Sequence, residues 1–477
     1  MRFLSEDINL KIKTFLESKI YVLIISLLIL LSYAFGGYYT GFGIALFSIL
    51  LNIIFKTNFS SLPITYFACL ASTKTKYISP LDFNFKSIPL YLLIALMVIT
   101  LVVFLIDFIK NIKYCYKDIF KNPINIVILI MVIPMLFSIM NSVNISNTIF
   151  GIILHLENLL IGIFIIMKSK IDDKFKENFG FCLMMIIYIL LFEVFDVFLD
   201  YCVFNPDGNI TIKEYLNNVT KVEKAFLWAH PNHGLYLGLV SLFGSYYLFV
   251  KNKGILKFLA FITLPILAGL SLFLDSRGTL LAIVIVFIFF VIDYIKKHKE
   301  NVKTDKFYIG VIAVGIIACI AACFILPTIR EKILKFYELG LNGRKETYQA
   351  AFSTWLDKEF HNNTIFGCGI NAQKYYLLKY GRPEYHYHNY FLETLACLGV
   401  FGVVCLAISF VIMAITFFKN KNFSILIVGL FAFILVNGLI DTIIYNEIIM
   451  PYVFMILYSF YKERNDKKEY IITLNEV

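Results

Sequence analysis

Two arginines and a histidine lie in polar stretches between long apolar runs, and their side chains suit two kinds of chemistry. Arg277 follows Asp275-Ser276, and Arg344 opens an amphipathic stretch. A guanidinium fork beside the N–H groups of a helix N-terminus favours a doubly charged oxyanion such as a phosphate. His388 precedes Asn389, and histidine titrates near neutral pH, which makes it the usual general base for a hydroxyl nucleophile.

Each of the three also has a purely structural interpretation. Arg277 fits an interfacial anchor whose guanidinium reaches the lipid headgroups, and on spacing alone this interpretation is favoured. Arg344 fits an exposed helix residue paired with a nearby carboxylate such as Glu346, an interaction that stabilises little. His388 lies between two tyrosines, which fits the aromatic belt of a membrane interface.

Further polar residues accompany these three. His386 competes with His388 for the role of base, and Glu384 lies where it could orient either ring. Glu393 falls about one and a half turns into the next apolar run, and an acidic residue at that depth usually has a functional partner. The turn 230–233 lacks nearby carboxylates for a metal site and is expected to line a substrate instead. The expected substrate-binding residues are His230, Asn232, His233, Ser276, Arg382, His386, Asn389 and Glu393.

The composition predicts an all-α polytopic membrane protein. Of the 477 residues, 59% are hydrophobic and 16% are charged, whereas about one quarter of a soluble domain is charged. Apolar runs of spanning length, about 20 residues each, recur along the chain. The expected segments, about 12–14 by this length criterion, lie near 20–35, 38–55, 61–73, 87–109, 124–140, 146–167, 178–200, 233–251, 255–274, 279–295, 307–327, 389–418, 422–440 and 445–461. The third is short enough to be interfacial or re-entrant.

The net charge of +10 predicts topology, not nucleic-acid binding. In a membrane protein, excess Lys and Arg mark the cytoplasmic loops. More than half of the basic residues fall in loops that are cytoplasmic if both termini lie inside. The loop 74–86, with its lysines, is the exception. This topology puts the loop 201–232, the turn 274–278 and the loop 328–387 at the outer face of the plasma membrane.

Several classes of protein are disfavoured. No P-loop and no GxGxxG stretch occurs, and the nine cysteines show neither metal-ligand spacing nor a CxxC pair. We therefore expect no nucleotide, no metal and no other cofactor. The first apolar run follows mixed-charge residues and continues into a second one, unlike a cleavable signal peptide. Because no internal repeat is visible, residues 1–477 are expected to form a single membrane domain.

The long polar loop 328–387 is expected to carry part of the active site. Polar loops of this length inside a compact bundle are usually functional or disordered, and the clusters of Arg, His and aromatic residues argue against disorder. A helix is predicted from Arg344 to Phe360, because apolar residues recur at the spacing i, i+3, i+4, i+7. These residues are Tyr348, Ala351, Phe352 and Trp355.

The order of these features resembles the O-antigen ligase/polymerase family of bacterial envelope proteins. The resemblance spans about residues 225–410 and consists of the following pieces in order: Asn232 before a helix, Ser276-Arg277-Gly278, Gly343-Arg344 in a large loop, Phe366-Gly367-Cys368-Gly369, and His388-Asn389-x-x-Leu392-Glu393-x-Leu395 followed by Gly399-x-x-Gly402. The last piece is the most specific. His233 after the Pro-Asn turn and Cys368 between the glycines depart modestly from the family pattern.

The resemblance implies a GT-C-like fold and a metal-independent glycosyl transfer. The donor would be a glycan on undecaprenyl diphosphate, and the acceptor would be a hydroxyl of a glycan or a lipid. Arg277 and Arg344 would hold the diphosphate, and His388 would position or deprotonate the acceptor hydroxyl. The implied partners are the lipid-linked glycan, its acceptor, the bilayer and other polysaccharide-assembly membrane proteins, with no nucleic acid.

Three alternatives stay open from the residues. Members of this family divide into polymerases, which join repeat units, and ligases, which move finished glycan to a lipid, teichoic acid or protein; the residues favour a polymerase only slightly. A flippase or transporter would show internal repeats and charges near the membrane midplane. An acyltransferase would need a histidine on the inner side, where only His298 lies among lysines.

Overall fold

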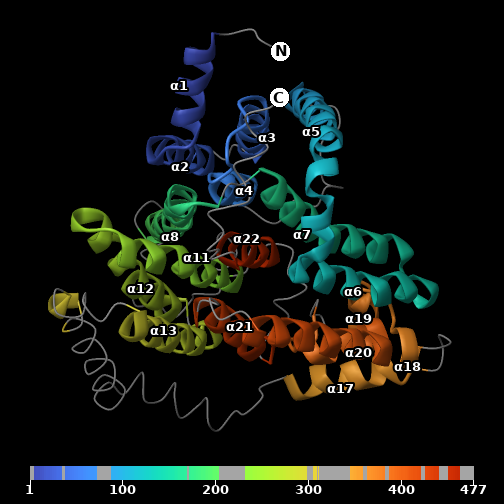
Figure 1. The fold of residues 1–477 in the computed structure, drawn as a ribbon. Coiled ribbons are helices and arrows are strands. Elements are labelled where there is room, and N and C mark those ends of the chain that lie inside the picture. Colours follow the sequence, from blue (N-terminus) through green and yellow to red (C-terminus); the bar gives the residue numbers. More distant parts are fainter. Residues whose placement is uncertain are drawn as a thin grey trace.

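The computed structural model describes residues 5–34, 38–71, 88–168, 171–202, 231–274, 276–297, 305–308, 310, 344–357, 363–381, 386–419, 425–439 and 449–461. All regular structure in these ranges is helical (Figure 1). The helices are α1 (Glu6–Leu16), α2 (Lys19–Ala34), α3 (Tyr38–Ile54), α4 (Leu62–Ala71), α5 (Ile88–Lys121), α6 (Pro123–Ser138), α7 (Ile145–Lys168), α8 (Asp173–Cys202), α11 (Pro231–Lys251), α12 (Gly254–Phe273), α13 (Arg277–Lys297), α17 (Arg344–Trp355), α18 (Asn363–Phe366), α19 (Gln373–Lys379), α20 (Tyr390–Lys419), α21 (Ile425–Gly438) and α22 (Ile449–Tyr461), with a short 3-10 turn at Ile139–Asn141.

The expected all-α polytopic class is confirmed. In the described part of the chain, eight helices are long and apolar enough to cross a membrane, or nine if α1 and α2 form one bent span. Shorter apolar helices cover Tyr39–Ile54, Ile427–Gly438 and Ile449–Phe460. Each expected apolar segment coincides with a helix, except 307–327, most of which lies outside the described residues.

The short third segment is a buried helix and not a span. α4 has only 10 residues, about half the length that a bilayer core requires. Its residues Ile64, Phe67 and Ala68 have no solvent exposure, and the hydroxyl of Tyr452 on α22 donates to the carbonyl oxygen of Pro63 at 3.2 Å. Because α4 is short and buried, it packs inside the bundle and does not cross the membrane.

Close helix packing fixes the direction of α11 against α8. A Cβ at Gly180 would lie 3.0 Å from the carbonyl oxygen of Gly244, and further along a Cβ at Gly238 would lie 3.5 Å from Leu190. The residue numbers run in opposite senses, so the two helices are antiparallel. Small residues at such contacts let backbones approach closely, which is how apolar helices associate in a membrane.

These contacts sort the helix ends into two groups. The side-chain amide of Asn178 near the start of α8 donates to the carbonyl oxygen of Glu17 after α1. The hydroxyl of Tyr246, late in α11, donates to Asp293, late in α13, at 2.8 Å. The late part of α13 therefore lies at the α1 end of the bundle, and its first residue, Arg277, lies at the other end.

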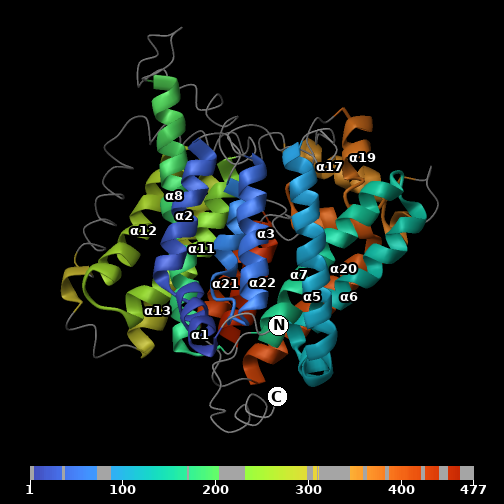
Figure 2. The same ribbon diagram turned by 90° about the horizontal axis from the view of Figure 1, so that it is seen from above.

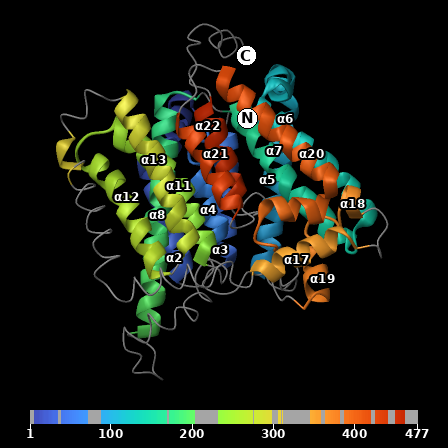
Figure 3. The same cartoon turned by 90° about the horizontal axis from the view of Figure 1, so that it is seen from below.

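The opposite end of the bundle, which we call the α17 end, holds the polar elements. α17 and α19 lie away from α1 in two perpendicular views (Figures 1 and 2), and the view from below shows α17 and α19 next to each other (Figure 3). The last residue of α21 is also there, because a Cβ at Gly438 would lie 3.3 Å from the Cβ of Tyr390, the first residue of α20. The starts of α13, α17 and α20 thus share one end of the bundle.

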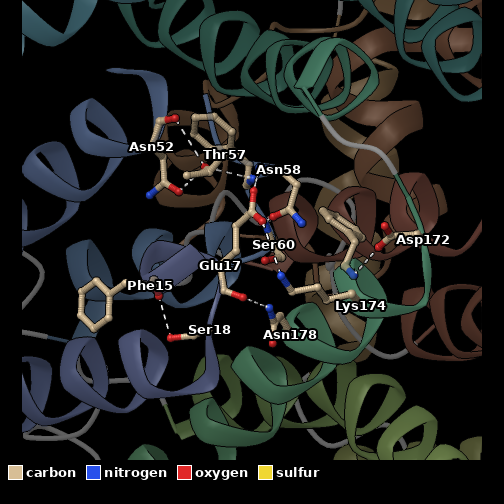
Figure 4. A network of polar contacts seen from close by, with 12 residues as sticks. Phe15, Glu17, Ser18, Asn52, Thr57, Asn58, Ser60, Asp172, Lys174 and Asn178 are labelled. Carbon is tan, nitrogen blue, oxygen red and sulfur yellow. Dashed lines mark hydrogen bonds and ion pairs between the residues drawn. The ribbon is translucent and has the colours of Figure 1, made fainter. Parts of the chain in front are cut away.

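At the α1 end, a polar network holds the break between α1 and α2 (Figure 4). The two helices meet at 61°. At the break, the carboxylate of Glu17 accepts a hydrogen bond from the backbone N–H of Asn58 at 2.9 Å and lies 3.8 Å from the ammonium of Lys174. Glu17 thereby joins the α1–α2 break, the α3–α4 turn and the start of α8.

We expect Glu17→Ala to destabilise the protein. The side chain is only 11% exposed, and its removal deletes the hydrogen bond from the Asn58 N–H to a charged acceptor, which is worth about 1.5–3 kcal/mol. Thermal unfolding of the detergent-solubilised full chain measures the change. Lys11→Ala is the control, because Lys11 and Asp7 form an ion pair at 2.7 Å that is largely exposed and contributes little. Equal midpoints for the two variants would refute the role of Glu17.

Candidate functional site at the α17 end

α17 packs on α20 through small side chains. Arg344 is its first residue and is half-buried. The predicted helix exists but ends at Trp355 and not at Phe360, and of its four predicted apolar positions only Ala351 belongs to the buried face. Phe352 is 46% exposed, and the buried face consists instead of Thr347, Ala350, Ala351 and Thr354. Two helices at close range leave no room for large aromatic side chains between them, so the small residues turn inward.

Asn389 forms the N-cap of α20. Its side-chain oxygen accepts hydrogen bonds from the backbone N–H groups of Phe391 at 3.0 Å and Leu392 at 3.1 Å, which satisfies donors that a helix start leaves open. Its amide nitrogen donates to the carbonyl oxygen of Leu439 at 3.3 Å. The polar atoms of Asn389 therefore tie the start of α20 to the end of α21.

His388 has a left-handed backbone, with φ of 51°. A non-glycine residue in this region costs about 1–3 kcal/mol and persists only where surrounding contacts impose it, which is common at functional sites. Here the hydroxyl of Tyr348 on α17 lies 3.4 Å from the carbonyl oxygen of His388 and 3.5 Å from that of Leu439. The half-buried imidazole is thus displayed on a constrained turn between α17, α20 and α21.

A carboxylate–imidazole pair lies next to this turn. Glu393 is fully buried, and its Oε1 is 3.0 Å from Nδ1 of His386, whose side chain is 34% exposed. The other oxygen, Oε2, accepts a hydrogen bond from the backbone N–H of Tyr387 at 2.7 Å. Glu393 thus has a hydrogen-bonding partner in His386. Glu384, the residue expected to orient the ring, lies outside the described residues.

Tyr387 anchors the stretch between the two histidines. Its hydroxyl is 2.7 Å from Oγ1 of Thr354, which lies 2.8 Å from the carbonyl oxygen of Ala350. The Thr354 hydroxyl donates to that carbonyl, so Tyr387 donates to Thr354. Burial raises the pKa of the Tyr387 phenol well above its usual range, which keeps it neutral and a donor. Tyr387 points inward, and the imidazoles on either side of it stay accessible.

The loop at Gly367-Cys368-Gly369 supplies hydrogen-bond donors to carbonyl oxygens at a break in α20. The helix is interrupted at Gly399, which has φ of 65° and ψ of −167°. The N–H of Cys368 donates to the carbonyl oxygen of Ala396 at 3.0 Å, and the N–H of Gly369 donates to that of Cys397 at 3.0 Å. Non-helical backbone inside a membrane bundle requires such replacement partners.

Two glycines allow this contact. A Cβ at Gly399 would lie 2.2 Å from the carbonyl oxygen of Ile365, and a Cβ at Gly367 would lie 2.1 Å from the carbonyl carbon of Cys397. Both obstacles are backbone atoms, which cannot rotate away, and both glycines have positive φ. The two positions require glycine for space and for conformation.

The same loop also contacts the start of α7. The hydroxyls of Ser142 and Thr148 lie 2.7 Å apart, and a Cβ at Gly369 would come within 2.6 Å of both. A Cβ at Gly151 on α7 would lie 3.0 Å from the side-chain nitrogen of Asn371. The loop is therefore held between α7 and the broken α20, which positions α19 and the histidines beyond it.

The predicted site residues fall into three groups. His386, His388, Asn389 and Glu393 lie together at the start of α20, with Arg344 at the start of the neighbouring α17. Ser276 is buried before α13, with its hydroxyl 2.8 Å from that of Thr279. The backbones of Asn232, His233 and Arg277 begin α11 and α13, but their side chains lie outside the described set, as do residues His230 and Arg382.

Sequence reasoning missed three residues that shape the site. Tyr348 and Thr354 on α17 hold the histidine stretch, and Gln373 on α19 brings its amide nitrogen 3.3 Å from Nδ1 of His386. Tyr348 and Thr354 lie within the predicted helix, but Tyr348 was predicted only as an apolar position and Thr354 was not among the predicted positions. Gln373 carries no signal in the sequence. Among the described residues, no group of three or more His, Cys, Asp or Glu side chains is arranged to hold a metal.

The fold and the site define an integral membrane protein of many helices, with a polar, histidine-bearing site at one end. Residues 262–407 match the family model described as O-antigen ligase. This stretch contains α13, α17 and the start of α20. This match supports the assignment of the chain to membrane enzymes of the O-antigen ligase/polymerase type. No curated protein matches the chain.

Proposed function

We propose that the protein is a membrane glycosyltransferase that moves a glycan from undecaprenyl diphosphate to an acceptor hydroxyl, and that it joins repeat units of an envelope polysaccharide. One observation carries this proposal. The starts of α13, α17 and α20, which bear Arg277, Arg344 and His388, lie at the same end of the bundle and within the stretch that matches the family. A donor with a diphosphate and a lipid tail requires cationic groups at the membrane boundary.

Arg277 and Arg344 are the proposed diphosphate ligands. Each opens a helix, so guanidinium and helix N–H groups can act on one anion. Lipid diphosphate leaves as the glycosidic bond forms, and preorganised positive charge stabilises the charge that develops on it. His388, held on its constrained turn, contacts the acceptor hydroxyl. The reaction so described uses no metal.

The α17 end is the proposed outer face. More than half of the basic residues fall in loops that the charge pattern assigns to the cytoplasm. Described helix ends next to such loops, at the start of α8 and late in α13, lie at the α1 end. The donor glycan would then be used in the outer leaflet. Fusion of a reporter enzyme to the C-terminal residue tests this, with a cytoplasm-active reporter expected to be active.

The glycan profile of a deletion strain tests the reaction. We expect single repeat units to accumulate on the lipid in the deletion strain and in that strain complemented with His388→Ala, and polymer to return with the wild type. Units trapped on the inner leaflet would instead show a flippase, and normal polymer would refute the proposal.

A ligase is the second candidate, because the matching family model is described as O-antigen ligase. The same experiment separates the two. In that case the deletion strain holds polymer of normal length on the lipid that never reaches its acceptor.

A further inference from the structure

We propose that Cys368 and Cys397 form a disulfide that fastens the loop at Gly367-Cys368-Gly369 to the break in α20. This inference rests on the proposed outer position of the α17 end and is independent of the proposed transfer reaction. Both thiols are free in the structure, so the bond would be a covalent modification of the folded arrangement. Backbone spacing, side-chain contact, burial and compartment each support it.

The backbones at the two cysteines lie side by side. The N–H of Cys368 donates to the carbonyl oxygen of Ala396, and the N–H of Gly369 donates to that of Cys397, both at 3.0 Å. In a trans peptide, the N–H of one residue lies on the same side as the Cα of the residue before it. The Cα atoms of Cys368 and Cys397 therefore lie within about 6 Å of each other, below the upper limit of about 7 Å for a disulfide.

The two side chains also meet. The thiol of Cys397 forms a hydrogen bond with that of Cys368. The other contacts of the two sulfur atoms are long, at 3.9 Å from Cys368 Sγ to the carbonyl oxygen of Gly369 and 3.7 Å from Cys397 Sγ to Oε1 of Gln373. Because a thiol is a weak donor, these contacts do little to hold the sulfur atoms apart.

Both side chains are fully buried. In the folded protein, a disulfide at this position would be shielded from reducing agents, whereas exposed disulfides are the labile ones. The burial also means that an oxidant has to act before the loop docks on α20. The loop precedes α20 in the chain, so its thiol is available before the two segments meet.

The proposed compartment favours oxidation of the pair. Disulfides form and persist at the outer face of cells and are rare in the cytoplasm. Cys397 lies about two turns into α20, counted from the helix start at the α17 end. With the α17 end outside, both sulfur atoms lie on the outer side of the membrane.

The oxidant in this proposal is the disulfide of a thiol–disulfide oxidoreductase at the outer face. The thiolate of Cys368 attacks one sulfur of that disulfide, and the other sulfur leaves as a thiolate. When the loop meets α20, the thiolate of Cys397 attacks the Cys368 sulfur and displaces the oxidoreductase. The two cysteines lose two electrons and two protons, and the oxidoreductase takes them up as its disulfide becomes a dithiol.

The bond would hold the part of the chain that positions α19 and the histidines. The break at Gly399 depends on backbone hydrogen bonds from the loop, and a covalent link keeps these donors in place. A disulfide that closes a loop also constrains the unfolded chain, which stabilises the folded state. Reduction is therefore expected to loosen the loop.

The test counts free thiols in the full chain from cells quenched in acid. The protein is unfolded in detergent, and its thiols are tagged with a maleimide that adds a known mass. Of the nine cysteines, we expect two fewer to be tagged before reduction than after it, and mass spectrometry should find the peptides of Cys368 and Cys397 joined. In Cys368→Ser, the number of tags should be the same before and after reduction.

Thermal unfolding of the detergent-solubilised protein tests the role of the bond. A phosphine reductant should lower the midpoint of the wild type, because the unfolded chain is no longer constrained, and should leave that of Cys368→Ser unchanged. A midpoint that the reductant does not lower in the wild type would refute the fastening role.

Cys405→Ser is the matched control, because Cys405 is another buried cysteine of α20; it should keep the reducible pair. Full tagging of the wild type before reduction would overturn the inference, as would a reducible bond that persists in Cys368→Ser. Neither measurement uses the transfer reaction. A bridged protein whose deletion leaves the glycan profile normal would refute the proposed function alone.

Discussion

Arg344→Ala and Arg277→Ala are each expected to abolish glycan transfer while the protein still reaches the membrane. Each residue opens a helix at the α17 end, where the proposed donor diphosphate would bind. Loss of one preorganised group that stabilises developing charge typically costs on the order of 10²–10³ in rate. The measurement is polymer length in the complemented deletion strain, together with the amount of protein in the membrane.

Lysine in place of either arginine should restore only part of the activity. Lysine keeps the charge but lacks the planar fork that binds two phosphate oxygens at once. Lys345→Gln is the matched control, since Lys345 is the next residue of α17 and is exposed; it should behave as the wild type. Full polymer from either alanine variant would show that its arginine does not hold the diphosphate.

Gly399→Ala is expected to remove the candidate site by unfolding it locally. The added Cβ would meet the carbonyl oxygen of Ile365 at 2.2 Å, and the positive φ alone costs a non-glycine residue about 1–3 kcal/mol. The loop would have to leave α20, which would break the hydrogen bonds from Cys368 and Gly369. Lower thermal stability and loss of transfer should appear together, and Gly367→Ala should act in the same way.

Gly269→Ala provides the comparison. This glycine lies inside α12 with nothing within 4 Å of its added Cβ, and alanine in a helix interior is about 0.5–1 kcal/mol better than glycine. It should be as stable as the wild type or slightly more so. If Gly399→Ala melted at the same temperature as Gly269→Ala, the loop would not depend on the break in α20.

The helices were predictable because length and hydrophobicity decide them. A run too short to span, such as 61–73, could be recognised as unusual, but only packing shows that α4 is buried in the bundle. In α17 the helix was predicted correctly, but of its four predicted apolar positions only Ala351 belongs to the buried face. Hydrophobicity points large residues inward, but here the neighbouring backbone of α20 accepts only small ones.

The candidate site was predictable as a set of residues and not as a set of partners. The spacing of Gly367 and Gly399 was visible, but the contact between them joins segments 32 residues apart through backbone atoms. Glu393 was expected to have a partner, yet its pairing with His386 depends on a non-helical stretch whose path no periodicity describes. Gln373 could not be anticipated, because an amide on a short helix has no distinctive pattern.

The hydrogen bonds that join the loop to the broken α20 bear on how the protein is made. Residues 363–389 leave the ribosome before α20 does. The N–H groups of Cys368 and Gly369 therefore form their hydrogen bonds to the carbonyl oxygens of Ala396 and Cys397 only after α20 has been synthesised. A lone α20 in lipid would in turn carry two carbonyl groups without donors, which costs several kcal/mol each. The loop and the helix therefore complete each other, and the site closes only once α20 has been inserted. Because α20 follows most of the described helices in chain order, an enzyme that handles lipid-linked sugars becomes competent only after most of its membrane scaffold is in place.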